Sequence, residues 1–107
     1  MGTAYYIVFN TCPDRDSARR IAEALVERNL AACVNIVPGL HSVYRWKGKR
    51  ESAEELLLII KARAADYAKL EALVRELHPY ELPEIVAVSI ETGLPAYLKW
   101  IEHDVQS

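Results

Sequence analysis

The stretch ACVNIVPGLHSVYR, residues 32–45, decides the fold of this chain. It is rich in apolar and β-branched residues, so it predicts a long strand, with an interruption at Pro38–Gly39. The segment KGKR, residues 47–50, then predicts a turn with Gly48 at its tip. The stretch EELLLIIKAR, residues 54–63, predicts a strand that runs back along the first. A long β-hairpin therefore occupies the middle of the chain.

The segment before the hairpin predicts one strand and one helix. Residues 4–11 (AYYIVFNT) form an almost unbroken apolar run, typical of a strand buried on both faces. Asp14, Asp16 and Ser17 then offer N-cap oxygens for a helix whose apolar residues recur every three or four positions. Asn29 suits the end of this helix because asparagine tolerates left-handed backbone geometry.

The segment after the hairpin predicts a second helix, a strand and a short third helix. Asp66 offers an N-cap, and the second helix ends in the stretch HPYELPEI, residues 78–85, because Pro79 cannot continue it. The apolar run at residues 84–91 predicts the last strand. Pro95 suits the first turn of the third helix.

The predicted order is β-α-β-β-α-β with an extra C-terminal helix. This order predicts an α+β, ferredoxin-like sandwich, with both main helices on one face of an antiparallel sheet. The first strand is expected in the centre, beside the third and the fourth strands. The length of 107 residues predicts one domain, residues 1–107.

The hairpin is longer than a single domain of this size requires. Strands of about 14 residues at about 3.3 Å each reach on the order of 40 Å, whereas ordinary strands have about 5–6 residues. Exposed apolar edges invite pairing with another chain. We therefore expect the hairpin to dock on another subunit through its apolar residues, which are Val34, Ile36, Val37, Leu40, Val43, Tyr44 and Trp46.

Charge and composition exclude several classes of protein. The formal net charge of −2 and the pI of about 5.9 argue against a nucleic-acid binder, which needs a cationic surface. No stretch has the length of a membrane helix or the form of a signal peptide. Two cysteines without a CxxC spacing predict reduced thiols in the cytoplasm.

The predicted topology brings several polar residues together. The first and second strands run one way and the other two run back, so Cys12 at the end of the first strand lies near His78, Glu81 and Glu84. Cys33, at the start of the second strand, lies at the opposite end of the sheet. A disulfide between the two cysteines is therefore not expected.

Cys12 and His78 are candidate metal ligands, because copper prefers thiolate and imidazole. Glu84, Asp14 or Asp16 could add carboxylate oxygens. An alternative stays open for each residue: Cys12 fills the core as a small apolar side chain, and His78 stabilises the end of the second helix.

A second candidate site is a cleft between subunits, lined by Tyr44, Trp46, Lys61 and Tyr80. Aromatic walls with a few charges suit a small ligand. The alternative is that the aromatic side chains simply pack at a subunit interface.

An enzyme is not expected, because the sequence contains no catalytic triad order, GxSxG, HExxH or glycine-rich phosphate loop. The glutamates Glu54, Glu55, Glu81 and Glu84 are interpreted as mostly solvated. His41 and His103 are interpreted as surface residues.

At this point the chain resembles a known family. The segments AACVNIVPG, YRWKGK, ELLLIIKA, LHPYELPEIVAV and YLKWI are similar to those of the CutA divalent-cation tolerance proteins, and the likeness runs from Tyr6 to Ile101. It implies a cytoplasmic homotrimer of ferredoxin-like subunits, close in architecture to the PII signalling proteins, with a role in tolerance to metals and copper above all. The metal ligands proposed for the family match Cys12 and His78, and Cys33 matches a further family cysteine. A PII-like site for a small anion, or a scaffold for a protein partner, is the alternative that the resemblance leaves open.

Overall fold

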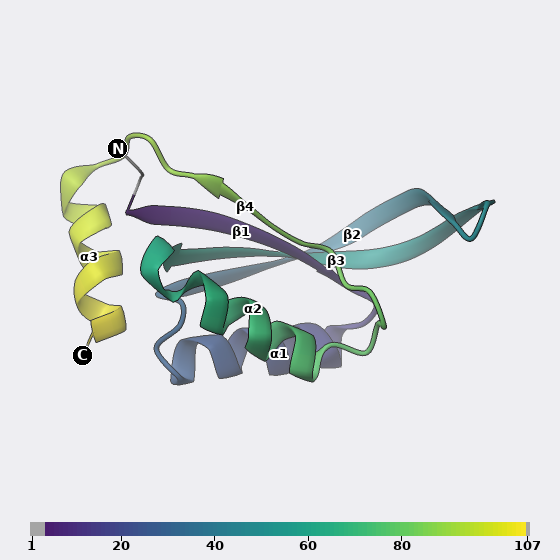
Figure 1. The fold of residues 1–107 in the computed structure, drawn as a ribbon, viewed down its shortest axis with the longest axis horizontal. Coiled ribbons are helices and arrows are strands. Elements are labelled where there is room, and N and C mark those ends of the chain that lie inside the picture. Colours follow the sequence, from purple (N-terminus) through teal and green to yellow (C-terminus); the bar gives the residue numbers. More distant parts are fainter. Residues whose placement is uncertain (1–3, 107) are drawn as a thin grey trace.

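A computed structural model describes the backbone of residues 4–106 and the side chains of residues 4–102. The side chain of His103 lies outside this part of the chain. Figure 1 shows the elements, which follow the predicted order. They are β1 (Tyr5–Cys12), α1 (Arg15–Glu27), β2 (Cys33–Trp46), β3 (Lys49–Arg63), a 3-10 turn (Ala64–Asp66), α2 (Tyr67–Leu77), β4 (Ile85–Ser89) and α3 (Pro95–Gln106).

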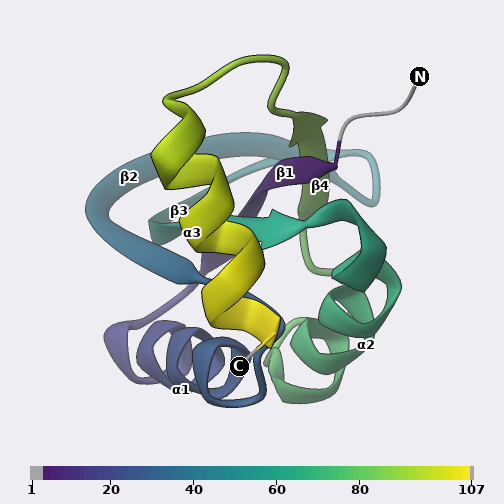
Figure 2. The ribbon, with the colours of Figure 1, turned by 90° about the vertical axis from the view of Figure 1, so that its left-hand side faces the viewer.

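The four strands form one antiparallel sheet in the order β2-β3-β1-β4. The central place of β1 is confirmed. Helices α1 and α2 lie on one face of the sheet, and α3 lies across one end of it (Figures 1 and 2). The predicted α+β, ferredoxin-like fold is therefore confirmed. Its core lies between the sheet and α1 and α2, and includes Val8, Ile21, Leu25, Leu58, Ile60, Leu70 and Val74.

The hairpin of β2 and β3 extends well beyond the rest of the sheet (Figure 1). Its pairing runs from Cys33 opposite Lys61 to Trp46 opposite Lys49, with a register shift at the predicted Pro38–Gly39. The strand β3 begins five residues before the predicted start at residue 54. Residues 49–53 are mostly polar and exposed, so they carry no apolar signal, and their pairing with β2 alone makes them a strand.

Two of the three predicted caps are present. Asp14 Oδ1 accepts hydrogen bonds from the Ser17 amide at 2.7 Å and from Ser17 Oγ at 2.9 Å, which satisfies the start of α1. Asn29 follows α1 with a left-handed φ of 60°. Asp66 precedes α2 but does not cap it, because its carboxylate accepts two hydrogen bonds from Arg63 at 2.8 and 3.0 Å.

The second face of the sheet is open over much of its area. On β1, Val8 and Cys12 face the helices and are buried, whereas Phe9 on the other face is only half-buried. The prediction that β1 is buried on both faces is therefore wrong for a single chain. Val86 and Val88 of β4 share this open face and remain about half exposed. An exposed apolar surface of this kind is typical of a binding surface for another chain or for a ligand.

Candidate functional site

His78 occupies the end of α2 and turns its ring toward the end of β1. Its own amide donates to the carbonyl of Val74 at 2.9 Å, so it closes the helix. The carbonyl of Thr11 accepts from Nε2 at 2.7 Å, and Nδ1 accepts from the amide of Tyr80 at 3.0 Å. Nε2 must carry the proton and Nδ1 must lack one, because a carbonyl only accepts and an amide only donates. The structure therefore fixes a neutral imidazole.

Cys12, the last residue of β1, is fully buried beside this histidine. Its thiol donates to Oδ1 of Asn10 at 3.4 Å, and Nδ2 of Asn10 donates to the carbonyl of Glu84 at 2.8 Å. Burial, and then the charges of Asp14 and Glu55, raise the pKa of Cys12 from 9.0 to about 12. The thiol is therefore protonated at neutral pH in this closed arrangement.

Glu55 of β3 also belongs to this cluster, although it is interpreted from the sequence as one of the mostly solvated glutamates. Its side chain is buried, with 8% of the residue exposed, and Oε2 accepts from the hydroxyl of Tyr80 at 2.8 Å. Burial and this hydrogen bond raise the pKa of Tyr80 well above its usual range. The sequence contains one signal for this burial. Glu55 directly precedes the apolar run LLLII, where β3 begins to pair with β1.

The structure thus brings Cys12 and His78 together at the end of β1, as predicted, and adds Tyr80, which was assigned to the second candidate site. Glu84 contributes its main-chain carbonyl, while its side chain is exposed. Among residues 4–102, no three or more His, Cys, Asp or Glu side chains are arranged to hold a metal ion. Both ring nitrogens of His78 and the thiol of Cys12 already have hydrogen-bond partners, so a cation would have to displace some of them.

In a single chain, the residues predicted to line the second candidate site do not all lie together. Tyr44 and Trp46 lie half-exposed on the outer part of β2, and Tyr44 is close enough to contribute to the raised pKa of Tyr80. Lys61 lies opposite Cys33, near the other end of β3, where it donates to Asn35 Oδ1. Within one subunit, Lys61 therefore does not share a site with the aromatic residues.

Cys33 and His41 lie where they were predicted. Cys33 is a free, half-buried thiol, and no disulfide joins it to Cys12. His41 is exposed on the hairpin, where Nδ1 lies 2.5 Å from Oε2 of Glu54.

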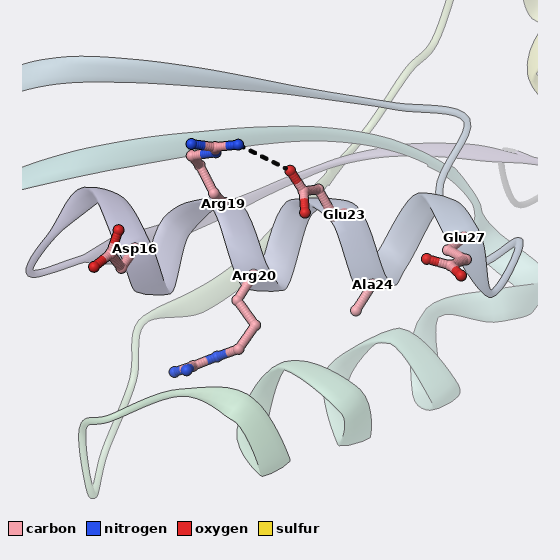
Figure 3. Close-up of a pocket in the computed structure, with 6 residues that line it drawn as sticks. All are labelled: Asp16, Arg19, Arg20, Glu23, Ala24 and Glu27. Atoms are coloured by element: carbon pink, nitrogen blue, oxygen red, sulfur yellow. Dashed lines mark ion pairs between the residues drawn. The ribbon is translucent and has the colours of Figure 1, made fainter.

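A hollow on the outer face of α1 is the other feature with several charges (Figure 3). It contains none of the predicted site residues except Asp16, which was weighed as an additional carboxylate. Arg19 and Glu23 form an exposed pair at 3.6 Å, which contributes little to stability, and Arg20 reaches the carbonyl of Leu77 at 3.5 Å. The lining side chains belong to one solvated helix face: Asp16, Arg19, Arg20, Glu23, Ala24 and Glu27.

Comparison with known proteins identifies the family. The family model described as CutA1 divalent ion tolerance protein matches residues 6–104. The chain belongs to the CutA1 family. The resemblance noted in the sequence is confirmed, because CutA1 proteins share both the sequence pattern and the fold.

Individual CutA relatives support this assignment. The divalent-cation tolerance protein CutA of Thermus thermophilus is 50% identical over 92% of this chain and 95% of its own length. A CutA homolog of Xenopus laevis is 50% identical over 85% of this chain, which spans only 60% of that relative. The solved CutA1 structures from Thermus thermophilus (49% identity, 94% of this chain and 97% of that one) and Oryza sativa (39%, 96% and 94%) each superpose with a TM-score of 0.92.

The names of CutA relatives point to several compartments. An Arabidopsis thaliana relative is named chloroplastic, and a solved Archaeoglobus fulgidus protein is named periplasmic. In the described part of this chain, no helix is both long and apolar enough to cross a membrane.

Proposed function

We propose that this CutA1-family chain serves divalent-cation tolerance as a non-catalytic, copper-binding homotrimer of the cytoplasm. The observation that carries the proposal is the state of His78, which is neutral and anchored through Nε2 on the Thr11 carbonyl. Metal-binding histidines commonly donate their second ring nitrogen to a carbonyl in this way, which orients the first toward the ion. Here the other nitrogen, Nδ1, accepts from the amide of Tyr80, so a cation would have to displace that donor.

The donor chemistry of this cluster fits a cation of intermediate softness. Cys12 supplies sulfur and His78 supplies an imidazole nitrogen, the ligands that copper and zinc prefer. Glu84 is the carboxylate predicted to complete the set. The thiol of Cys12 must lose its proton on binding, while His78 is already in the neutral form that binds metals.

The open face of the sheet and the hairpin support a homotrimer. Val86 and Val88 leave apolar area uncovered in one chain, and Val43, Tyr44 and Trp46 do the same along the hairpin. Both surfaces become buried if the hairpin of each subunit lies along the sheet of the next. Light scattering should then give three times the mass of 12.1 kDa at micromolar concentration.

The second candidate function is binding of a small anionic ligand between subunits, at Tyr44, Trp46, Tyr80 and Lys61. The exposure of the two hairpin aromatics favours it. Because Lys61 lies far along β3 from them, such a site would need Lys61 from a neighbouring subunit.

The first experiment is a competition titration of the reduced protein with Cu(I) and Zn(II) against chelators of known affinity. We expect one ion per chain, with binding lost in Cys12→Ser. Cys33→Ser is the matched control, because it removes a thiol outside the cluster, and it should bind like the parent protein. Unchanged affinity in Cys12→Ser would rule out this site.

A further inference from the structure

We propose that the tip of the hairpin binds a dianionic phosphate group between Arg45 and Arg50. These two residues lie directly opposite each other, Arg45 on β2 and Arg50 on β3. The proposal is independent of the cation proposed at Cys12 and His78.

The tip of the hairpin carries a concentrated positive charge. Residues 45–50 (RWKGKR) contain four of the 13 Lys and Arg residues and no Asp or Glu, although the net charge of the chain is −2. The hairpin extends well beyond the rest of the sheet, so the carboxylates on the helices lie far from its tip (Figure 1). An anion near the tip therefore meets a positive field that the net charge conceals.

Arg45 and Arg50 form a like-charged pair across the two strands. Residues directly opposite in an antiparallel pair project from the same face, with Cβ atoms about 4.5–5.5 Å apart, and like charges at such positions are destabilising. Both side chains are exposed, and neither forms an ion pair with another side chain of residues 4–102. A counter-ion from outside the single chain would remove this repulsion.

The strand pleat separates the arginine pair from the lysines of the tip. Trp46 and Lys49 form the next pair along the hairpin, so they project from the opposite face. Lys47 stays with Trp46, because its ammonium lies 5.8 Å from the centroid of the indole ring. One face of the tip therefore presents two guanidinium groups, and the lysines lie with the indole.

Two guanidinium groups suit a phosphate ligand. Each presents N–H donors in a planar fork that matches two phosphate oxygens, and these charge-assisted hydrogen bonds are among the strong ones. A phosphate group carries a charge of about −1.5 to −2 at pH 7, so it balances both arginines, whereas a carboxylate balances only one. The pair therefore favours phosphate over carboxylate.

The neighbouring residues determine where the phosphate group lies. A hollow beside the pair is lined by His41, Val43, Arg50, Glu51 and Ser52. The carboxylate of Glu51 repels an anion there, and farther along the hairpin His41 is already paired with Glu54. The phosphate group is therefore held at the end of the hollow next to the turn, between the two arginines.

The test is a calorimetric titration of the assembled protein with inorganic phosphate and with methyl phosphate, at pH 8 and constant ionic strength. Arg45→Gln and Arg50→Gln are compared with Lys49→Gln, because each variant removes one positive charge from the tip but only the first two change the pair. We expect the phosphate affinity to fall at least about 10-fold in each arginine variant. Lys49→Gln should lose less than about twofold, because a more distant exposed charge is screened by salt.

Thermal unfolding gives a second test. Arg50→Glu places opposite charges across the strands, so its Tm without phosphate should exceed that of the parent protein. Added phosphate should raise the Tm of the parent protein and of Lys49→Gln more than that of Arg50→Glu, because only the first two keep the site. An equal rise in all three would overturn the proposal.

The titrations also separate the alternatives. Equal losses of affinity in Arg50→Gln and Lys49→Gln would overturn the proposal, because phosphate would then only screen the charge of the tip. If Arg50→Gln dissociates the oligomer at unchanged phosphate affinity, the counter-ion is a carboxylate of a neighbouring subunit, and the proposal is again overturned. Tighter binding of methyl phosphate would support an esterified phosphate as the ligand, and tighter binding of inorganic phosphate would support the free ion.

Discussion

Two neighbouring glutamates of β3, Glu54 and Glu55, lie in opposite environments. Glu54 faces solvent and pairs with His41 on the hairpin, where both side chains are more than 60% exposed. Glu55 points to the other side of the strand, is buried, and connects through Tyr80 to His78. Successive residues of a strand face opposite sides, so one step along the chain separates a solvated ion pair from a buried polar cluster. Identical residue types thus acquire different roles through the pleat alone.

The two cysteines give the largest expected difference. Cys12 is buried with a pKa of about 12, whereas Cys33 is partly exposed. Only the thiolate reacts with iodoacetamide, so at pH 8 Cys12 should be alkylated at least about 100-fold more slowly than Cys33. Mass spectrometry of digested samples would measure both rates. Comparable rates would show that the cluster opens readily.

The pKa of Cys12 also has a consequence for alkaline stability. Because the folded value exceeds the ordinary 9.0, the stabilising effect is complete below pH 9 and is lost as the pH rises toward 12. Urea unfolding of the parent protein should show a stability that falls over this range. Cys12→Ala should remove part of that pH dependence, and Cys33→Ala should leave it unchanged.

Replacing His78 or His41 should give the next largest difference. His78→Ala leaves the Thr11 carbonyl and the Tyr80 amide without partners, which should lower the free energy of unfolding by about 2–3 kcal/mol. His41→Ala removes only an exposed pair, so its effect should stay within about 0.5 kcal/mol. Urea unfolding without metal would measure both, and equal effects would refute the contrast.

The smallest difference concerns the two glutamates themselves. Glu55→Gln replaces a buried carboxyl group that forms no ion pair within residues 4–102, and we expect the metal-free protein to gain about 1 kcal/mol of stability. Glu54→Gln should change stability by less than about 0.5 kcal/mol. Thermal unfolding would compare the two, and a clear loss of stability in Glu55→Gln would show that its charge is paired in the assembly.

The fold could be predicted because its signals are local. Pro38–Gly39, Gly48 and Pro79 divide the chain at the places where the strands and the second helix bend or end. The position of Cys12 near His78 followed from strand directions alone, and it is confirmed by the hydrogen bond from His78 to Thr11.

The contacts that complete the cluster could not be predicted. Glu55 is buried where its carboxylate accepts from the hydroxyl of Tyr80, which lies 25 residues away in the sequence. Asp66 was expected to cap α2, but the guanidinium of Arg63 competes for it, and a charge-assisted pair is stronger than a cap. Such choices among polar partners depend on distances that periodicity does not encode.

The tip of the hairpin has a consequence for the order of folding. Lys47 and Gly48 both adopt positive φ, at 51° and 79°, which matches a two-residue turn to the natural twist of the strands. Contacts next to such a turn close short loops, whereas pairing β1 with β4 must close most of the chain and costs more entropy. We expect pairing of β2 with β3 to start at the turn and to proceed away from it. The formed hairpin then offers the edge of β3 for pairing with β1. Gly48→Val, which disfavours the left-handed turn, should therefore slow refolding more than it speeds unfolding.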